Sequence, residues 1–261
     1  MVDKMKDYKG YLIDLDGTMY KGSEPISEAP GFINQLRKAK KPFLFVTNNS
    51  TSSPKEVSKK LNEQFKVEAY ESEVYTSSLA TADYLKSLGG KTVYVVGEKG
   101  LIEAVLNAGF KIDEENPDHV VVGLDRALTY EKCEKATLAI QKGANFIATN
   151  KDTNLPTERG MVPGAGSVVA LIEKATRIAP TFVGKPEAII MDEAIKRIGF
   201  KKDEVLMVGD NYETDILAGI NNEVDTLLVY TGFTKEEDMR TVIKQPTYAI
   251  QTLADWKLND D

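Results

Sequence analysis

The sequence predicts an α/β fold, in which a doubly wound, Rossmann-like parallel sheet carries an inserted, smaller α/β domain. Short runs of β-branched and aromatic residues alternate with amphipathic stretches, as in repeated βα units. The chain has 261 residues, more than one domain usually needs and too few for three. One gap between polar strand ends is far too long for a single helical crossover, so it must contain a domain.

Seven runs have the composition of buried strands, and the segments between them carry helix signals. The expected strands are Tyr11–Ile13, Pro42–Val46, Thr92–Val96, Val120–Val122, Phe146–Ala148, Val205–Val208 and Thr226–Val229. Ser53, Pro54 and Glu56 form a capping box with proline at the first helical position. A second helix is predicted over residues 188–198, because its apolar residues recur at helical spacing and Gly199 follows it.

The long gap lies between Thr47 and Lys185 and defines the expected domain limits. We expect residues 1–79 and 182–261 to form one discontinuous core domain. Residues 80–181, which are βα-patterned themselves, form the inserted domain.

Composition excludes several classes of function. The net charge of -7 provides no basic surface for nucleic acid or an anionic membrane. Residues 1–10 are polar where a signal peptide is apolar, and one cysteine allows no internal disulfide, so we expect a cytoplasmic protein. The single histidine, His119, gives little support to hydrolases with a histidine base or to sites built from several imidazoles.

Two pairs of aspartates follow predicted strands. Asp14 and Asp16 come directly after the first strand and precede Gly17, which allows a sharp turn. Asp210 ends a later strand, and Asp215 follows near a helix start. Because ligands of open α/β sheets bind beyond the carboxyl ends of the strands, we expect these acids to converge. Gathered carboxylates repel one another unless a hard divalent cation binds them, and such an oxygen site suits Mg²⁺.

Two further strand ends carry groups that suit an anionic substrate. Thr47, Asn48 and Asn49 follow the second strand, and Lys185 precedes the helix over residues 188–198. Hydroxyl, amide and backbone N–H groups hold phosphoryl oxygens, and a lysine stabilises their charge. The sequence therefore predicts a magnesium-assisted reaction on a small phosphorylated metabolite.

In this order the motifs resemble the four motifs of the haloacid dehalogenase (HAD) superfamily. They are Asp14-Leu15-Asp16-Gly17-Thr18, Thr47-Asn48-Asn49, Lys185, and Gly209-Asp210 with Thr214-Asp215. The resemblance covers essentially the whole chain. The insertion between the second and third motifs is similar to the type-2 cap of the class IIA branch, which contains NagD-like and p-nitrophenylphosphatase-type phosphatases.

The resemblance implies a phosphatase that works through an aspartyl-phosphate. Asp14 would be the nucleophile, and Asp16 the general acid and later the base. The metal would be held by the side chains of Asp14 and Asp210 and the backbone carbonyl of Asp16, with Asp215 in or near its second shell of ligands. A proton donor at Asp16 favours phosphoryl transfer over dehalogenation, because a leaving oxygen needs a proton and a halide does not.

The remaining expectations concern the substrate and the alternatives. Cap loops of this branch contact the leaving group, which makes Asp125, Asn150 and Asp152 candidate substrate-binding residues. Sugar phosphates, nucleoside monophosphates and similar small esters are the expected substrates, and a homo-oligomer remains open. A phosphomutase would return the phosphoryl group to an organic acceptor. A phospho-accepting regulatory module would be about half this length and needs no cap.

Overall fold

A computed structural model describes residues 6–258, and these form two compact units that are described separately. Unit 1 contains the described residues up to Val46, residues Val57–Tyr75, and the described residues from Met191 onward. Unit 2 contains Thr47–Glu56 and Thr76–Ile190. Residues 47–56, 76–79 and 182–190, which the sequence places in the core domain, thus group with unit 2.

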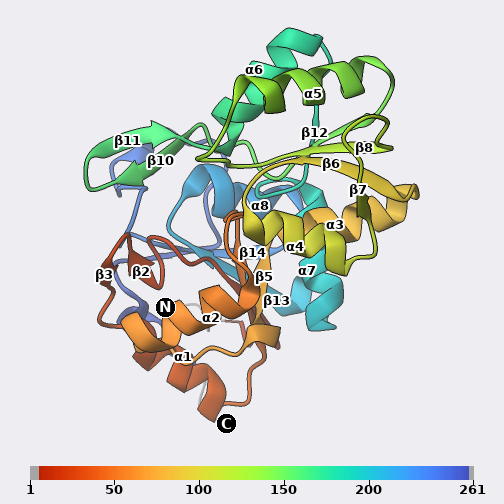
Figure 1. The fold of residues 1–261 in the computed structure, drawn as a ribbon. Helices are drawn as coiled ribbons and strands as arrows, with labels where there is room; N and C mark the ends of the chain where they lie inside the picture. Colours follow the sequence, from red (N-terminus) through yellow and green to blue (C-terminus); the bar gives the residue numbers. More distant parts are fainter. Residues whose placement is uncertain (1–5, 259–261) are drawn as a thin grey trace. The chain divides into compact units, whose positions relative to one another are not determined.

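The sheet of unit 1 has six strands in the order β15-β14-β13-β1-β4-β5. Figure 1 labels β5, β13 and β14 of this sheet. Its strands are β1 (Gly10–Ile13), β4 (Phe43–Thr47), β5 (Val74–Thr76), β13 (Val205–Gly209), β14 (Asp225–Val229) and β15 (Tyr248–Ile250). Strand β1 pairs in parallel with both β13 and β4. Chain order reverses on its two sides, so β1 lies at the switch point of a doubly wound sheet, as predicted.

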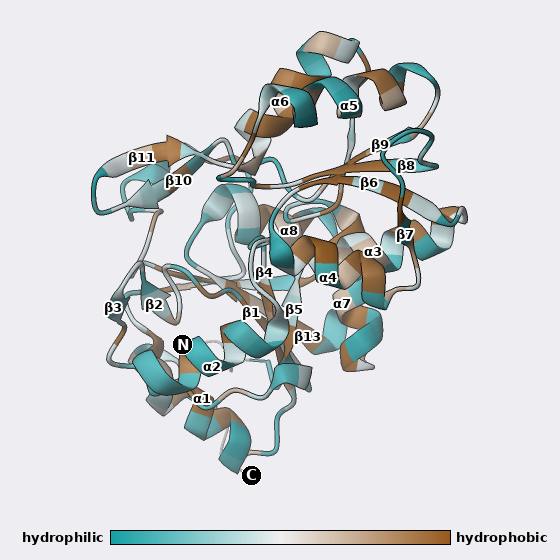
Figure 2. Ribbon diagram, viewed as in Figure 1, coloured by the Kyte–Doolittle hydropathy of each residue, from teal (hydrophilic) through white to brown (hydrophobic). Residues whose placement is uncertain are grey.

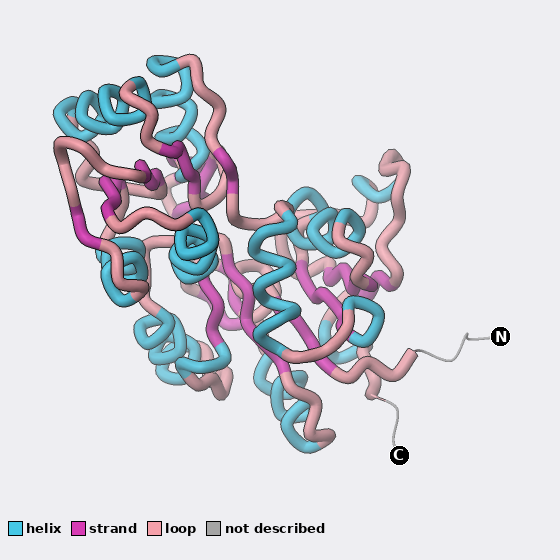
Figure 3. The backbone as a smooth tube through the Cα atoms, turned by 90° about the vertical axis from the view of Figure 1, so that its right-hand side faces the viewer, coloured by secondary structure: helices cyan, strands magenta, loops and turns pink. Residues whose placement is uncertain are grey.

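Alternate residues of these strands face a large apolar core. Ile13, Phe45 and Val208 pack in one cluster with residues of helices α1 (Ala29–Lys38) and α2 (Pro54–Gln64). The period of two follows from the pleat of a strand. A smaller cluster joins Leu228 to Ile216 and Met239. Unit 1 also contains helix α8 (Leu217–Asn221) and the part of α7 (Ala188–Ile198) from Met191 onward. Figure 3 shows the helices and strands along the backbone.

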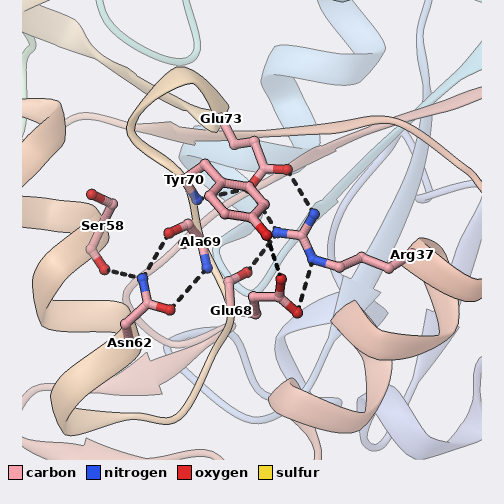
Figure 4. Close-up of polar contacts among 7 residues, drawn as sticks. All are labelled: Arg37, Ser58, Asn62, Glu68, Ala69, Tyr70 and Glu73. Atoms are coloured by element: carbon pink, nitrogen blue, oxygen red, sulfur yellow. Dashed lines mark hydrogen bonds and ion pairs between the residues drawn. The ribbon is translucent and has the colours of Figure 1, made fainter.

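A polar cluster fixes the segment after α2 in unit 1 (Figure 4). The Arg37 guanidinium donates to both carboxylate oxygens of Glu73, over 2.9 and 2.8 Å, and to the Glu68 carbonyl over 3.0 Å. The Asn62 amide donates to the Ala69 carbonyl over 2.6 Å. A bidentate arginine pair holds both position and orientation, so residues 68–73 are anchored where β5 begins.

The sheet of unit 2 has five strands in the order β12-β9-β8-β6-β7, and neighbouring strands pair in parallel. They are β6 (Thr92–Val96), β7 (Lys111–Ile112), β8 (His119–Val122), β9 (Asn145–Ala148) and β12 (Thr181–Phe182). The central strands are strongly hydrophobic (Figure 2). Helices α5 (Tyr130–Gln141) and α6 (Ala165–Thr176) pack on one face, and α3 (Ser77–Leu88) and α4 (Lys99–Asn107) lie on the other (Figure 1).

Two antiparallel hairpins extend from the parallel sheets. One pairs β2 (Tyr20–Lys21) with β3 (Glu24–Pro25) in unit 1. The other pairs β10 (Asn154–Thr157) with β11 (Gly160–Pro163) in unit 2. Among residues 6–258, no helix is long and apolar enough to cross a membrane.

The predicted elements agree closely with this structure. Each of the seven expected strands is present, with its ends within one residue of the prediction. The capping box is formed, because the Ser53 N–H donates to Glu56 over 2.9 Å and the Glu56 N–H donates to the Ser53 hydroxyl over 3.3 Å. The short edge strands β5, β7, β12 and β15 were not predicted.

Candidate active site

The two acidic motifs of unit 1 meet at the carboxyl edge of its sheet. Ile13 pairs with Val208 in the parallel register of β1 and β13. Asp14, the residue after β1, therefore lies opposite Gly209 at the end of β13, and Asp210 is the next residue of that chain segment. The Asp14 N–H continues the ladder by donating to the Val208 carbonyl over 2.8 Å. Adjacent parallel strands thus deliver two carboxylates to one place.

Asp14, Asp210 and Asp215 form a buried acidic cluster. Each contributes one carboxylate oxygen, and these oxygens all lie within 4.8 Å of one another. At that separation and an effective dielectric constant of about 20, each ionised pair repels by about 3.5 kcal/mol. Three hard oxygen donors at this spacing suit a hard divalent cation, which would remove the repulsion. The donor set therefore fits a divalent metal ion.

Asp16 lies apart from this cluster. Its side chain is exposed, and one of its oxygens accepts a hydrogen bond from the Gly22 N–H over 3.3 Å. Its neighbour Gly17 has φ +92°, a conformation that only glycine adopts without strain, and donates to the Tyr20 carbonyl over 2.6 Å. Burial, and the charges of Asp16 and Asp14, raise the pKa of Tyr20 above its usual range. The turn thus directs the second carboxylate toward solvent while the first is buried.

Asp210 is enclosed by two glycines and held by two donors. The Phe233 N–H donates to Asp210 Oδ2 over 2.6 Å, and the Thr18 hydroxyl donates to Oδ1 over 3.4 Å. A Cβ atom at Gly17 would lie 2.2 Å from this carboxylate, and one at Gly232 would lie 1.9 Å from it. The backbone approaches Asp210 so closely on both sides that its carboxylate has little freedom to move.

Asp215 returns to the cluster through one turn of π-helix, Tyr212–Ile216. The Asn211 N–H donates to Asp215 Oδ2 over 3.1 Å, and the Thr214 hydroxyl donates to Oδ1 over 3.3 Å. Single π-turns are frequent at functional sites because they redirect one side chain within a helix. Here the turn places the Asp215 side chain over Gly209, where a Cβ would lie 2.3 Å from the Asp215 Cβ.

The loop of residues 231–234 supports this cluster and was not predicted from the sequence. Besides the Phe233 N–H, the Thr231 hydroxyl donates to the Gly17 carbonyl over 2.6 Å. The Thr234 N–H donates to the Asp210 carbonyl over 3.1 Å, and its hydroxyl accepts from the Tyr212 N–H over 2.8 Å. The signal was present, because Thr-Gly-Phe-Thr follows a predicted strand in the same way as the other motifs.

The loop after β4 belongs to unit 2, and its own side chains shape it. The Thr47 hydroxyl accepts from the Asn49 N–H over 3.1 Å. The Asn49 side-chain oxygen accepts from the Thr51 N–H over 2.7 Å and from the Thr51 hydroxyl over 2.9 Å. Hydroxyls of Ser77 and Ser78 donate to the carbonyls of Asn48 and Ser50 over 2.7 and 2.9 Å. The loop is therefore held in one conformation from within unit 2.

Asn48 also contacts the Lys185 backbone and the loop after β9. Its amide accepts from the Lys185 N–H over 2.8 Å and donates to the Lys185 carbonyl over 3.0 Å. It donates to the two Asp152 oxygens over 3.1 and 3.2 Å. Asn150 donates to the Asn48 carbonyl over 2.8 Å. These four predicted site residues, 137 positions apart at their extremes, are thus brought together in unit 2.

Asp125, the remaining candidate from the inserted domain, supports its own loop. One carboxylate oxygen accepts from Lys132 Nζ over 2.6 Å, and the other accepts from the Ala127 N–H over 2.9 Å. The side chain is 2% exposed. Both oxygens thus have partners within unit 2.

Comparisons with known proteins identify the class. The family model of haloacid dehalogenase-like hydrolases matches residues 11–111, and a second HAD hydrolase-like model matches residues 182–256. The chain belongs to the haloacid dehalogenase-like hydrolases, as the motifs predicted.

Similar proteins narrow this class to NagD-like phosphatases. The chain is 51% identical to the 5'-nucleotidase YutF of Bacillus subtilis (strain 168), over 97% of this chain and 98% of that protein. A double mutant of the thermostable NPPase from Geobacillus stearothermophilus is 50% identical, with a TM-score of 0.92 over 98% of this chain and 100% of that one. NagD from E. coli K-12 is 33% identical, with a TM-score of 0.92 over 97% and 100% of the two chains. Fold and enzyme class were therefore predicted correctly.

Proposed function

We propose that this phosphatase is a Mg²⁺-dependent phosphomonoesterase that hydrolyses small phosphate esters through an aspartyl-phosphate on Asp14. The acidic cluster of Asp14, Asp210 and Asp215 carries the proposal, since its three oxygens lie within 4.8 Å of one another. Bound Mg²⁺ would neutralise charge on this cluster and on the phosphate, and would act as a Lewis acid. The ligands would be the carboxylates of Asp14 and Asp210 and the carbonyl of Asp16, with Asp215 beside them.

The chain's own residues divide the reaction into two displacements. An Asp14 oxygen attacks phosphorus as the ester P–O bond breaks, and the leaving oxygen takes a proton from Asp16. Asp16 then removes a proton from water, whose oxygen attacks phosphorus and releases inorganic phosphate and the Asp14 carboxylate. The exposure of Asp16 supports this role, because an acid that serves both leaving group and water must be reachable by them.

The motifs of unit 2 supply the remaining charge stabilisation in this proposal. Lys185 would offset the charge of the nucleophile and the phosphoryl oxygens, and the segment of Thr47, Asn48 and Asn49 would contribute hydroxyl and backbone N–H donors. Asn150 stays a candidate for a contact near the leaving group, in a unit that would serve as the cap. Because both Asp125 oxygens are bound within their loop, we assign that residue a supporting role.

Substrates are expected among sugar phosphates, nucleoside monophosphates and similar small esters. YutF is named a 5'-nucleotidase, and a similar protein from Bacillus stearothermophilus is named a p-nitrophenylphosphatase, so the names of similar proteins cover both a nucleotide and an aryl ester. A screen of phosphomonoesters against the purified enzyme would rank these classes. Cytoplasmic location and oligomeric state stay predictions from the sequence.

The first test measures phosphate release from p-nitrophenyl phosphate, with and without Mg²⁺, for wild type and Asp14→Asn. We expect Mg²⁺-dependent turnover that the substitution abolishes, because an amide is a poor nucleophile and a weaker metal ligand. The matched control is Asp203→Asn, an exposed aspartate of unit 1, which should keep wild-type rates.

Other outcomes would point to different chemistry. Wild-type turnover that survives Asp14→Asn would rule out the nucleophile assigned here. Isomerised sugar phosphate without free phosphate would indicate a mutase. A phosphorylated Asp14 that persists for minutes would indicate a regulatory phospho-acceptor.

A further inference from the structure

Asn48 engages the backbone of Lys185 at two points. The Lys185 N–H donates to Asn48 Oδ1 over 2.8 Å, and Asn48 Nδ2 donates to the Lys185 carbonyl over 3.0 Å. The Asn48 amide thus forms hydrogen bonds with both the N–H and the C=O of the same residue, as a neighbouring strand does in a β-ladder. Such a pair fixes the Lys185 backbone and, with it, the direction in which the lysine side chain leaves the chain.

This pair extends a ladder that ends just before Lys185. The Val183 N–H donates to the Ala148 carbonyl over 3.0 Å, and the Gly184 N–H donates to the Thr149 carbonyl over 2.8 Å. A Cβ at Gly184 would lie 2.6 Å from the Thr149 carbonyl oxygen and 2.7 Å from Asn48 Oδ1, so only glycine fits between them. The segment of residues 183–185 is therefore held by backbone hydrogen bonds to β9 and the residue after it, and by the Asn48 side chain at Lys185.

The Asn48 amide itself is held by the loop after β9. Its second N–H faces the Asp152 carboxylate, with Nδ2 3.1 and 3.2 Å from the two oxygens. The Asp152 N–H donates to Asn150 Oδ1 over 3.1 Å, and Asn150 Nδ2 donates to the Asn48 carbonyl over 2.8 Å. These bonds close a ring that returns to Asn48.

The number of hydrogen-bond donors on the Asn48 amide decides whether this side chain can bind phosphate. An asparagine side chain has two N–H donors, and here Lys185 and Asp152 take them both. Neither donor is left for a phosphoryl oxygen. Lys185 is only 1% exposed, so its side chain is packed on all sides and a shift of its backbone would displace the ammonium group within the site.

We infer that Asn48 is a positioning residue that acts through Lys185, and that Asp152 acts through Asn48 and does not contact the leaving group. The inference rests on the proposed function, in which Lys185 stabilises phosphoryl charge. It revises the direct substrate roles that the sequence suggested for both side chains.

A double-mutant cycle tests the inference. We would measure kcat and KM for Asn48→Ala, Lys185→Ala and the double variant on p-nitrophenyl phosphate. Lys185→Ala should lower kcat by on the order of 10³ and Asn48→Ala by about 10 to 10², as for loss or misplacement of one stabilising group. Since Asn48 acts through Lys185, the double variant should match Lys185→Ala within about threefold. Multiplied effects would overturn the inference, because they would give Asn48 a contribution of its own.

A second comparison separates positioning from substrate contact by Asp152. Asp152→Ala should lower kcat by the same factor for aryl, sugar and nucleoside phosphates with little change in KM. Asp152→Asn, which keeps an acceptor for the Asn48 amide, should restore most of the rate. A loss that differs among leaving groups or appears in KM would refute this role. If Asn48→Ala does not fold, the cycle with Lys185→Ala is measured with Asp152→Ala.

Two controls keep the outcomes distinct. Asn116→Ala removes an exposed asparagine of unit 2 and should leave kcat and KM unchanged. Active wild type with inactive Asp14→Asn preserves the proposed function whatever the cycle shows. An inactive wild type would refute the proposed function instead.

Discussion

Replacing Gly232 by alanine should disable the acidic cluster without touching a carboxylate. The added Cβ would lie 1.9 Å from Asp210 Oδ2 and 2.4 Å from its Cγ, whereas real Cβ contacts essentially never fall below 3.0 Å. The carboxylate and the loop must therefore separate by at least 1.1 Å. Asp210 has little room to retreat toward Gly17, because a Cβ built on Gly17 would lie 2.2 Å from the same carboxylate oxygen.

The size of the effect follows from this displacement. Metal and catalytic groups must be held within about 0.5 Å, and a misplacement of about 1 Å can cost about 10² in rate. We expect kcat to fall by on the order of 10², or about 2.7 kcal/mol of transition-state stabilisation. The Mg²⁺ concentration for half-maximal activity should rise about 10- to 100-fold, the usual cost of disturbing groups that support a metal ligand.

The assay is a Mg²⁺ titration of p-nitrophenyl phosphate turnover, together with melting temperatures with and without Mg²⁺. Weakened binding should shrink the Mg²⁺-induced rise in melting temperature. Gly31→Ala is the control, because nothing lies within 4 Å of the added Cβ and the residue is in helix α1. It should keep wild-type kinetics and gain up to about 1 kcal/mol. A Gly232→Ala enzyme with wild-type Mg²⁺ dependence and kcat within threefold would refute the reasoning.

Three further predictions concern stability. Backbone N–H donors at the start of β6 hold the pKa of Asp118 below its usual range, so its charge stabilises the fold above about pH 4. This contribution disappears as pH falls through the lowered pKa. The melting temperatures of Asp118→Asn and wild type should therefore differ most near pH 7 and converge in acid below that pKa, and a difference that is constant with pH would contradict this. Arg37→Lys loses the bidentate pair with Glu73 shown in Figure 4. In urea unfolding, its free energy of unfolding should fall by about 1 to 3 kcal/mol, with kcat unchanged. A stability equal to that of wild type would count against this role of the pair. Ile172→Ala leaves a cavity at a fully buried position of unit 2 and should lower the free energy of unfolding by about 2 to 5 kcal/mol in the same assay. Leu171 is 48% exposed, so Leu171→Ala should change this free energy by about 0.5 kcal/mol or less. Equal losses for the two variants would argue against this core assignment.

Much of the fold could be predicted because its strands are local signals. Tyr11–Ile13 and Val205–Val208 are short apolar runs that end in acids, and parallel pairing then brings those acids to one edge. Edge strands such as β12, with two residues, bury too little to leave an apolar pattern. The period-two signal needs at least four residues to be recognised.

The support around the candidate site could be predicted only in part, because its key contacts are non-local. The Asn48 amide and the Lys185 backbone are 137 positions apart, and no spacing rule predicts a hydrogen bond between them. The same holds for Thr231, whose hydroxyl reaches the Gly17 carbonyl 214 positions away. The residue types of the motifs were enough to predict which side chains could bind metal and phosphate. Which distant groups form hydrogen bonds with those motifs depends on the order of the strands in the sheet.

The spacing of the fourth motif can now be explained by packing. Asp210 must leave β13 beside Asp14, since their strands are adjacent and in register. Asp215 reaches the same cluster by returning over the strand end, and the π-turn of residues 212–216 provides that return. The returning side chain occupies the volume that a Cβ at position 209 would need, 2.3 Å from its own Cβ. Gly209 is therefore as necessary to the geometry of this cluster as the two acids, because a larger residue would displace Asp215 from its place beside Asp14.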